Sequence, residues 1–314
     1  MRHKRNAQPR AVLALLFVSL LWACGALHQE LFPLRLSGVL PQFAALTIPL
    51  GLLAVTAGVL SCLRREQWSS GRRLRSAVWI GLGLFTAPAL LIHLSAGWIS
   101  GFELIALFTL VPVFSIVLEP HLSHPATHPI RGALPAALLA VLGTLLVFPA
   151  SVPASIPAAL ALAAIILAAA CVAAANCYAA SVFRESELRL AGPIATVAAS
   201  AAALTLGIAS LLTERSRWQT AAIAPALLSA AVVELPALLL VFWSLPRLSA
   251  ARISTCFVLA PLIFVLLGAL LMQLPLAPRT SLGLLGMAAG AGYLLLARDE
   301  EAEPATLLSG PHEP

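Results

Sequence analysis

The chain has 314 residues, of which 60% are hydrophobic and only 10% are charged. Soluble domains contain about 45–50% apolar and about 25% charged residues, and a soluble fold of this length cannot bury so much apolar surface. The composition therefore excludes an ordinary soluble protein, and the formal net charge of +6 indicates orientation in a membrane rather than binding to nucleic acid.

Runs of about twenty apolar residues are long enough to cross the hydrocarbon core of a bilayer, where only a helix satisfies its own backbone polar groups. We therefore predict an all-α integral membrane protein with ten transmembrane helices. The small, turn-prone stretch at Ser95–Gly101 separates the third span from the fourth. In chain order the expected spans are 11–30, 39–61, 77–97, 99–118, 133–149, 156–183, 191–212, 221–245, 252–272 and 281–297.

Most basic residues lie in the segments on one side of the membrane in this topology. With the N-terminus inside, the inner segments hold 15 Lys and Arg residues and the outer segments hold 4, which together make the 19 of the chain. This split follows the positive-inside rule. We therefore expect a bacterial-type inner-membrane protein with both termini in the cytoplasm, residues 1–10 forming a basic segment and residues 299–314 an acidic, disordered tail.

Two stretches of the chain resemble each other. Residues 89–118 match residues 238–267 at an offset of 149, with eight of thirty positions identical. The match predicts two halves of five helices, residues 11–150 and 151–298, which lie in opposite membrane orientations because five is odd. Inverted repeats of this kind are typical of secondary transporters, although chance similarity between two apolar hairpins is an alternative. The matched serines and prolines are Ser95 and Ser244, Ser100 and Ser249, and Pro112 and Pro261.

Glu234 is the clearest candidate for a residue of the transport pathway, because it lies near the middle of the span 221–245. A charge at the centre of a membrane helix costs about 2.5–3.5 kcal/mol on insertion scales, so such residues tend to face a cavity. A carboxylate there can bind an amine or carry a proton. The alternative is a neutral glutamate hydrogen-bonded to a neighbouring helix.

Five further residues are candidates for the substrate pathway. His93 and Glu103 flank the predicted outer hairpin, where they can pair or gate the mouth; the alternative is contact with lipid headgroups. Trp22 and Tyr178 can stack on a planar or cationic substrate. Asn176 can bind substrate or make a helix–helix hydrogen bond.

Two other patterns have structural explanations. The loop with His121, His124 and His128 has spacing that can bind a metal, but its prolines favour a solvated loop over a preorganised site. We therefore predict no metal. The GxxxG sequence Gly286–Gly290 packs helices closely, either inside the chain or between two copies in a homodimer.

Several short motifs occur in order along the chain. They are Leu21-Trp22-Ala23 with Gly25; Ser100-Gly101 before Pro112-Val113-Phe114; Asn176-Cys177-Tyr178 before Arg184; Ser249-Ala250-Ala251 before Pro261; and Leu282-Gly283 with Gly290. Over residues 11–297 this order resembles the EamA-type transporters of the drug/metabolite transporter superfamily. The resemblance implies ten helices in inverted five-helix repeats, and export or exchange of amino acids, nucleotide-related compounds or other metabolites.

We therefore expect a secondary transporter that exports a small metabolite, such as an amino acid, a nucleotide-related compound or a drug-like molecule, by alternating access. Its expected partners are that substrate and the lipid bilayer. The alternative is an accessory membrane subunit or a lipid-flippase-like component without independent small-solute transport. Since neither a P-loop nor HExxH, Gly-x-Ser-x-Gly or a paired-carboxylate motif occurs, we predict neither an enzyme nor a cofactor.

Overall fold

The computed structural model describes residues 7–31, 40–66, 71–122, 132–185, 191–215, 220–273 and 275–297. These residues are almost entirely helical, and an isolated bridge between Ala96 and Ile99 is the extended pairing found among them. Eight helical segments in the described part are long and apolar enough to cross a membrane. The chain is therefore an all-α protein built for several passes through a bilayer, as predicted.

The first half of the chain holds two straight helices, one bent helix, one broken helix and one short helix. They are α2 (Ala7–Leu31); α3 (Gln42–Leu63); α4 (Gly71–Gly81), the π-helix η1 (Leu82–Thr86) and α5 (Ala87–Ser95); α6 (Gly101–Phe108) and α7 (Val111–Leu122); and α8 (Ala133–Val147).

The second half repeats this order, and its last helix is longer than that of the first half. Its helices are α9 (Ile156–Glu185); α10 (Ala191–Thr213); α11 (Thr220–Ser229), the π-helix η4 (Ala230–Glu234) and α12 (Leu235–Ser244); α13 (Ala250–Ser254) and α14 (Cys256–Met272); and α15 (Pro278–Leu296). Eight of the expected spans correspond to helices that can cross a membrane. The other two, 133–149 and 281–297, correspond to α8 and α15.

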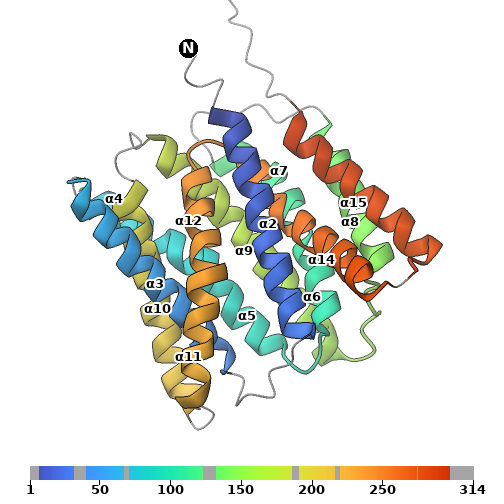
Figure 1. Cartoon of the computed structure of the whole chain (residues 1–314), viewed down its shortest axis with the longest axis horizontal. Helices are drawn as coiled ribbons and strands as arrows, with labels where there is room; N and C mark the ends of the chain where they lie inside the picture. The colour runs from blue at the N-terminus through green and yellow to red at the C-terminus, as the bar shows by residue number, and fades with distance from the viewer. Residues whose placement is uncertain are drawn as a thin grey trace, which may run out of the picture.

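Both bent helices contain one π-helical turn at equivalent places. In η1 the N–H of Ala87 bonds to the carbonyl of Leu82, and in η4 the N–H of Leu235 bonds to that of Ala230. Each turn is followed by a proline near the start of the next α-helix, a position that a residue without an N–H tolerates well. The turns lie 148 residues apart. The bent helices run in opposite directions, since α4 lies above α5 and α11 lies below α12 (Figure 1).

The broken helices start alike. The side chain of Ser100 accepts a hydrogen bond from the N–H of Glu103 at the start of α6, and Ser249 accepts one from the N–H of Arg252 at the start of α13, with donor–acceptor distances of 3.2 and 3.4 Å. Serine is a favourable helix cap because its oxygen satisfies an N–H that has no partner inside the helix. The matched serines of the sequence repeat therefore have a clear structural role.

The GxxxG sequence in α15 packs against α8 inside the chain. A Cβ on Gly290 would overlap the carbonyl of Ala136 and lie 2.8 Å from the Cβ of Ala140. A Cβ on Gly143 of α8 would lie 2.6 Å from the carbonyl of Gly283. Glycine is thus required on both sides of this seam, which lies at one edge of the molecule (Figure 1). The homodimer stays a prediction, but this glycine face is already used within one chain.

A buried carboxylate connects α10 to α3 by hydrogen bonds, at the edge of the molecule opposite α8 and α15. Glu214, only 3% exposed, follows the last turn of α10, and its oxygens accept hydrogen bonds from the N–H groups of Phe43 and Ala44 at 3.2–3.3 Å. Ser210 donates a further bond of 2.7 Å. These N–H groups belong to the first turn of α3, where the helix dipole also favours negative charge. At the other end of the same helix pair, Ser61 of α3 is buried next to Gly192 of α10.

Removing this cap is expected to weaken the protein. In Glu214→Ala the N–H groups of Phe43 and Ala44 lose their acceptor while they stay buried, which costs about 1–3 kcal/mol of unfolding free energy. Denaturant titration of the purified protein in micelles measures this loss. Thr213→Ala is the matched control, because Thr213 is exposed and bonds only to its own helix, at the carbonyl of Ala209. Equal stability of the two variants would contradict the capping role.

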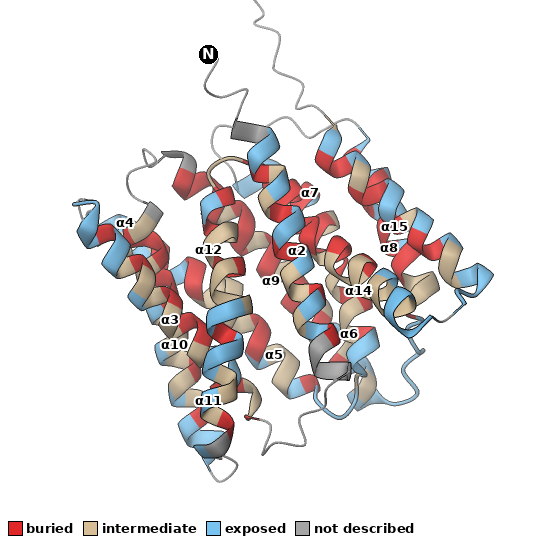
Figure 2. Cartoon of the chain, in the orientation of Figure 1, coloured by how far each residue is buried: buried red, intermediate tan, exposed pale blue. Residues whose placement is uncertain are grey.

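The exterior of the bundle is apolar. Large exposed side chains include Leu13, Leu142, Leu204, Leu270 and Leu285, all more than 60% exposed. Buried residues concentrate on the helices in the middle of the molecule, such as α9, while α11 and α12 show mainly intermediate and exposed residues to the viewer (Figure 2). An apolar surface of this extent is stable when lipid tails cover it.

Candidate functional site

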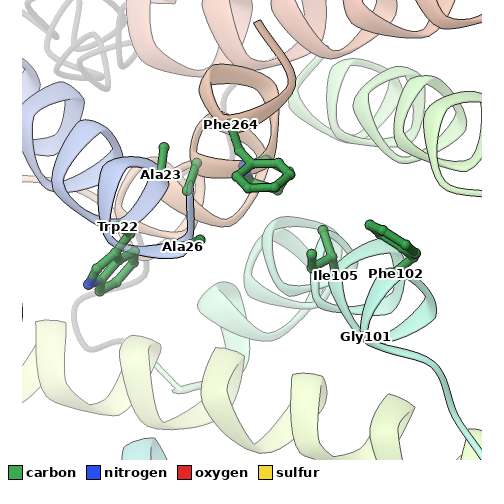
Figure 3. A pocket seen from close by; sticks show the side chains of 9 residues that line it. Trp22, Ala23, Ala26, Gly101, Phe102, Ile105 and Phe264 are labelled. Carbon is green, nitrogen blue, oxygen red and sulfur yellow. The ribbon is translucent and has the colours of Figure 1, made fainter. Parts of the chain in front are cut away.

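A chamber of about 460 Å³ lies between α2, α6 and α14. This volume is in the range of small-molecule sites, which are mostly apolar and have few polar groups. Figure 3 shows how α2, α6 and α14 supply its walls. The lining residues are Trp22, Ala23, Ala26, Gly101, Phe102, Ile105, Ala260, Pro261 and Phe264. Small residues on α2 and α6 leave the space, and large aromatic rings bound it.

The structure brings together two of the residues predicted from the sequence. Glu234, the half-buried last residue of η4, lies next to Trp22 on α2. The indole nitrogen of Trp22 points away from Phe264 (Figure 3), and Glu234 is not among the residues that line the chamber. Close contact between α2 and η4 permits this, since a Cβ on Gly25 would lie 3.1 Å from Val233.

A row of aromatic rings continues from the chamber into the bundle. The ring of Trp22 lies 6.3 Å from that of Phe257, which lies 6.0 Å from that of Phe108, measured between centroids. At the other wall Phe102 stacks on Phe148 with centroids 5.7 Å apart. Such contacts hold the rings in fixed orientations. The chamber therefore has preformed aromatic walls.

The region that corresponds to the chamber by the sequence repeat is filled by packed side chains. Adding or subtracting the repeat offset of 149 maps the six lining residues of α6 and α14 onto Ala250, Ala251, Ser254, Val111, Pro112 and Ser115, and every one of these is buried. The hydroxyls of Ser115 and Ser254 bond to each other at 2.7 Å. Near them, Glu119 accepts a hydrogen bond of 3.3 Å from the N–H of Ala250. The space is thus open near the start of α6 and closed near the start of α13.

His93 and Glu103, predicted to flank the outer hairpin where they can pair or gate the mouth, have different neighbours in the described structure. The ring of His93 packs on Phe43, with centroids 4.5 Å apart. The carboxylate of Glu103 accepts hydrogen bonds from the N–H groups of Ser100 and Ser151, at 2.8 and 2.9 Å. Glu103 thus completes the capping box at the start of α6. Its hydrogen bond from Ser151 holds the connection between α8 and α9 against this end of α6. A pathway role for either residue stays a prediction.

Asn176 and Tyr178 lie on different faces of α9. Asn176 is 3% exposed. The hydroxyl of Tyr178 donates to Ser76 of α4 at 2.7 Å. Neither residue lines the chamber. Tyr178 therefore has a structural contact that accounts for it, and its predicted substrate role stays untested.

Sequence reasoning missed the apolar chamber walls. Phe102, Ile105 and Phe264 line the chamber but do not differ in kind from the many lipid-facing apolar residues of the chain. The repeated motif around Pro261 was the available signal, because that proline is itself a lining residue. Among the described residues, no group of three or more His, Cys, Asp or Glu side chains can hold a metal; His124 and His128 lie outside the described residues.

No family model matches the chain, and no curated protein sequence matches it. Among solved structures, the chain is similar to one described only as "Crystal structure of protein", with 13% sequence identity and a TM-score of 0.71. The match covers 92% of this chain and 99% of that one. The fold is therefore one that solved structures already contain, over 92% of the chain, and at this identity the likeness extends to the fold alone.

The open and closed regions predict different reactivity toward a water-soluble maleimide. In a background without the five native cysteines, Ile105→Cys lines the chamber and is expected to react at least tenfold faster than Ser254→Cys, whose parent serine is 0% exposed. Mass spectrometry of the purified protein in lipid nanodiscs gives both rates. Equal rates would show that the open end is not selectively open in a bilayer.

Proposed function

We propose that this chain is a secondary transporter that moves a small metabolite across a bacterial-type inner membrane by alternating access. One observation carries the proposal. A chamber of about 460 Å³ lies near the start of α6, while the positions related to its six lining residues on α6 and α14 by the 149-residue offset are buried near the start of α13. A protein with a purely structural role has no need for such a difference between otherwise corresponding regions.

The proposed mechanism needs two halves with inverted orientation. Its support is the shared order of helices, the π-turns 148 residues apart, the equivalent serine caps, and the opposite directions of the two bent helices (Figure 1). In this proposal α8 and α15 also cross the membrane, giving ten spans. In this proposal both termini lie in the cytoplasm and the chamber lies on the outer side, which agrees with the positive-inside rule.

The resemblance to EamA-type transporters of the drug/metabolite transporter superfamily agrees with this proposal and suggests export. Repacking of the two ends would close the chamber and open its counterpart at Ser115 and Ser254, so that a bound solute changes sides. The substrate gradient, exchange or protons would supply the free energy. If protons supply the free energy, Glu234 is the proposed proton carrier.

Comparative export tests the function. Cells that overexpress the chain and cells with an empty vector are grown alike, and the metabolites of medium and cytoplasm are profiled. A compound that accumulates outside only with the chain is then tested for flux in liposomes that contain the purified protein alone. Flux in these liposomes is the expected result. Its absence, with export retained in cells, would favour the alternative of an accessory subunit.

A further inference from the structure

Two polar contacts join α7 to α13 in the closed region. The hydroxyl oxygens of Ser115 on α7 and Ser254 on α13 lie 2.7 Å apart, and both residues are 0% exposed. Glu119, which is on α7 as well, accepts a hydrogen bond of 3.3 Å from the N–H of Ala250 at the start of α13. Because α7 belongs to the first half of the chain and α13 to the second, these contacts hold the two halves together where the space is closed.

The positions equivalent to the two serines lie in the wall of the chamber. The 149-residue offset maps Ser254 onto Ile105 of α6 and Ser115 onto Phe264 of α14. The side chains of Ile105 and Phe264 line the chamber and extend from their helices toward the space between them (Figure 3). One pair of equivalent positions is therefore in contact, while the other pair is separated by the chamber.

Each broken helix carries one residue of each pair. In the first half, Ile105 precedes the break between α6 and α7, and Ser115 follows it. In the second half, Ser254 precedes the break between α13 and α14, and Phe264 follows it. A rotation of one broken helix against the other, about the region of the breaks, brings one pair together and moves the other pair apart. The two contacts are thus geometrically linked.

The edges of the molecule restrict movement of the two halves as whole units. Helices α3 and α10 belong to different halves, and a Cβ on Gly58 of α3 would lie 3.4 Å from the side chain of Thr196 on α10. The glycine contacts between α8 and α15 join the halves at the opposite edge (Figure 1). Because sliding along either edge breaks close contacts, the smaller movement is that of the broken helices.

We propose, building on the transport function above, that the two serines form one gate of the transport pathway and that Ile105 with Phe264 forms the other. Contact in one pair excludes contact in the other, and the serine gate is the closed one in this structure. In the opposite state Ile105 packs against Phe264 and closes the chamber, while the serines separate and Glu119 releases the N–H of α13. A solute between the gates then leaves on the other side.

A substitution that weakens the serine gate tests this assignment without a substrate. In a chain whose five native cysteines are replaced, Val111→Cys reports opening of the closed region, because Val111 is 0% exposed and corresponds to Ala260 in the chamber wall. Addition of Ser115→Ala removes the hydrogen bond to Ser254. We expect the cysteine to react about fivefold faster with a water-soluble maleimide in lipid nanodiscs. Ser61→Ala is the matched control, since Ser61 is equally buried and its hydroxyl bonds within α3.

Disulfide formation between Ile105→Cys and Phe264→Cys measures closure of the chamber. This bond requires the two Cβ atoms to approach within about 4.5 Å, so it reports the state opposite to that of the structure. Ser115→Ala is expected to speed its formation about fivefold at a fixed oxidant concentration, because the loss of the serine contact favours that state. A disulfide between Gly58→Cys and Thr196→Cys, at the edge formed by α3 and α10, is the control and is expected to form at an unchanged rate.

An unchanged rate of either reporter in Ser115→Ala would overturn the proposal. A faster maleimide reaction without faster closure of the chamber would show local loosening at the serines rather than two coupled gates. Equal acceleration of the edge disulfide, or equal acceleration by Ser61→Ala, would indicate general destabilisation and would also refute the gates. Ser254→Ala provides the same test if Ser115→Ala does not fold.

Flux in liposomes separates the gates from the transport function. Coupled reporter rates, without flux of any compound that cells export, would keep the two gates and remove transport. Flux with uncoupled reporter rates would keep the transporter and overturn the gates.

Discussion

Replacing Ala26 with tryptophan is expected to abolish flux through the chamber while leaving the fold intact. Ala26 lines the chamber on α2 and its side chain is exposed to that space, so an indole at this position fills the volume between Trp22 and Phe264 without displacing packed atoms. A transporter whose solute passes this point loses its pathway. We expect flux to fall at least tenfold, to the level of empty liposomes.

Ala163→Trp is the matched control for the blocked chamber. Ala163 is an exposed alanine on α9 that does not line the chamber, so the same change in volume there meets lipid. Flux of the exported compound is measured in liposomes with equal amounts of each protein, and thermal unfolding confirms that both variants fold. Unchanged flux in Ala26→Trp would place the solute pathway elsewhere in the bundle.

Adding one methyl group at Gly290 is expected to destabilise the protein, whereas the same change two residues later is not. A Cβ at Gly290 would overlap the carbonyl of Ala136 and crowd Ala140 at 2.8–2.9 Å, so α15 has to move away from α8. Overpacking of this kind costs about 1–3 kcal/mol or more. At Gly292 a Cβ meets nothing within 4 Å, and alanine is favoured over glycine in a helix by up to about 1 kcal/mol.

The pair Gly290→Ala and Gly292→Ala thus separates helix propensity from packing. Denaturant titration of both variants in micelles is expected to give a lower free energy of unfolding for the first and an equal or higher one for the second. Size-exclusion chromatography shows whether either change alters association between chains. Dissociation of a dimer by Gly290→Ala, without loss of stability, would instead assign the glycine seam to a contact between two copies.

The sequence alone determined the class of the protein and several of its parts. Long apolar runs predicted helices because a bilayer leaves no other way to satisfy backbone groups, and eight of these helices are long enough to cross it. The 149-residue offset predicted matched serines, which the structure shows as equivalent helix caps at Ser100 and Ser249. Glu234 stood out because a charge in the middle of an apolar helix is costly.

Only the tertiary structure decided which faces meet. It placed Trp22 of α2 beside Glu234 of η4, gave His93 the ring of Phe43 as its neighbour, and made Glu103 part of the cap of α6. The sequence could not show these contacts, because in a bilayer the lipid-facing and the buried faces of a helix are both apolar. Hydrophobic periodicity therefore carries little information, and the fit of small and large side chains between helices determines the packing.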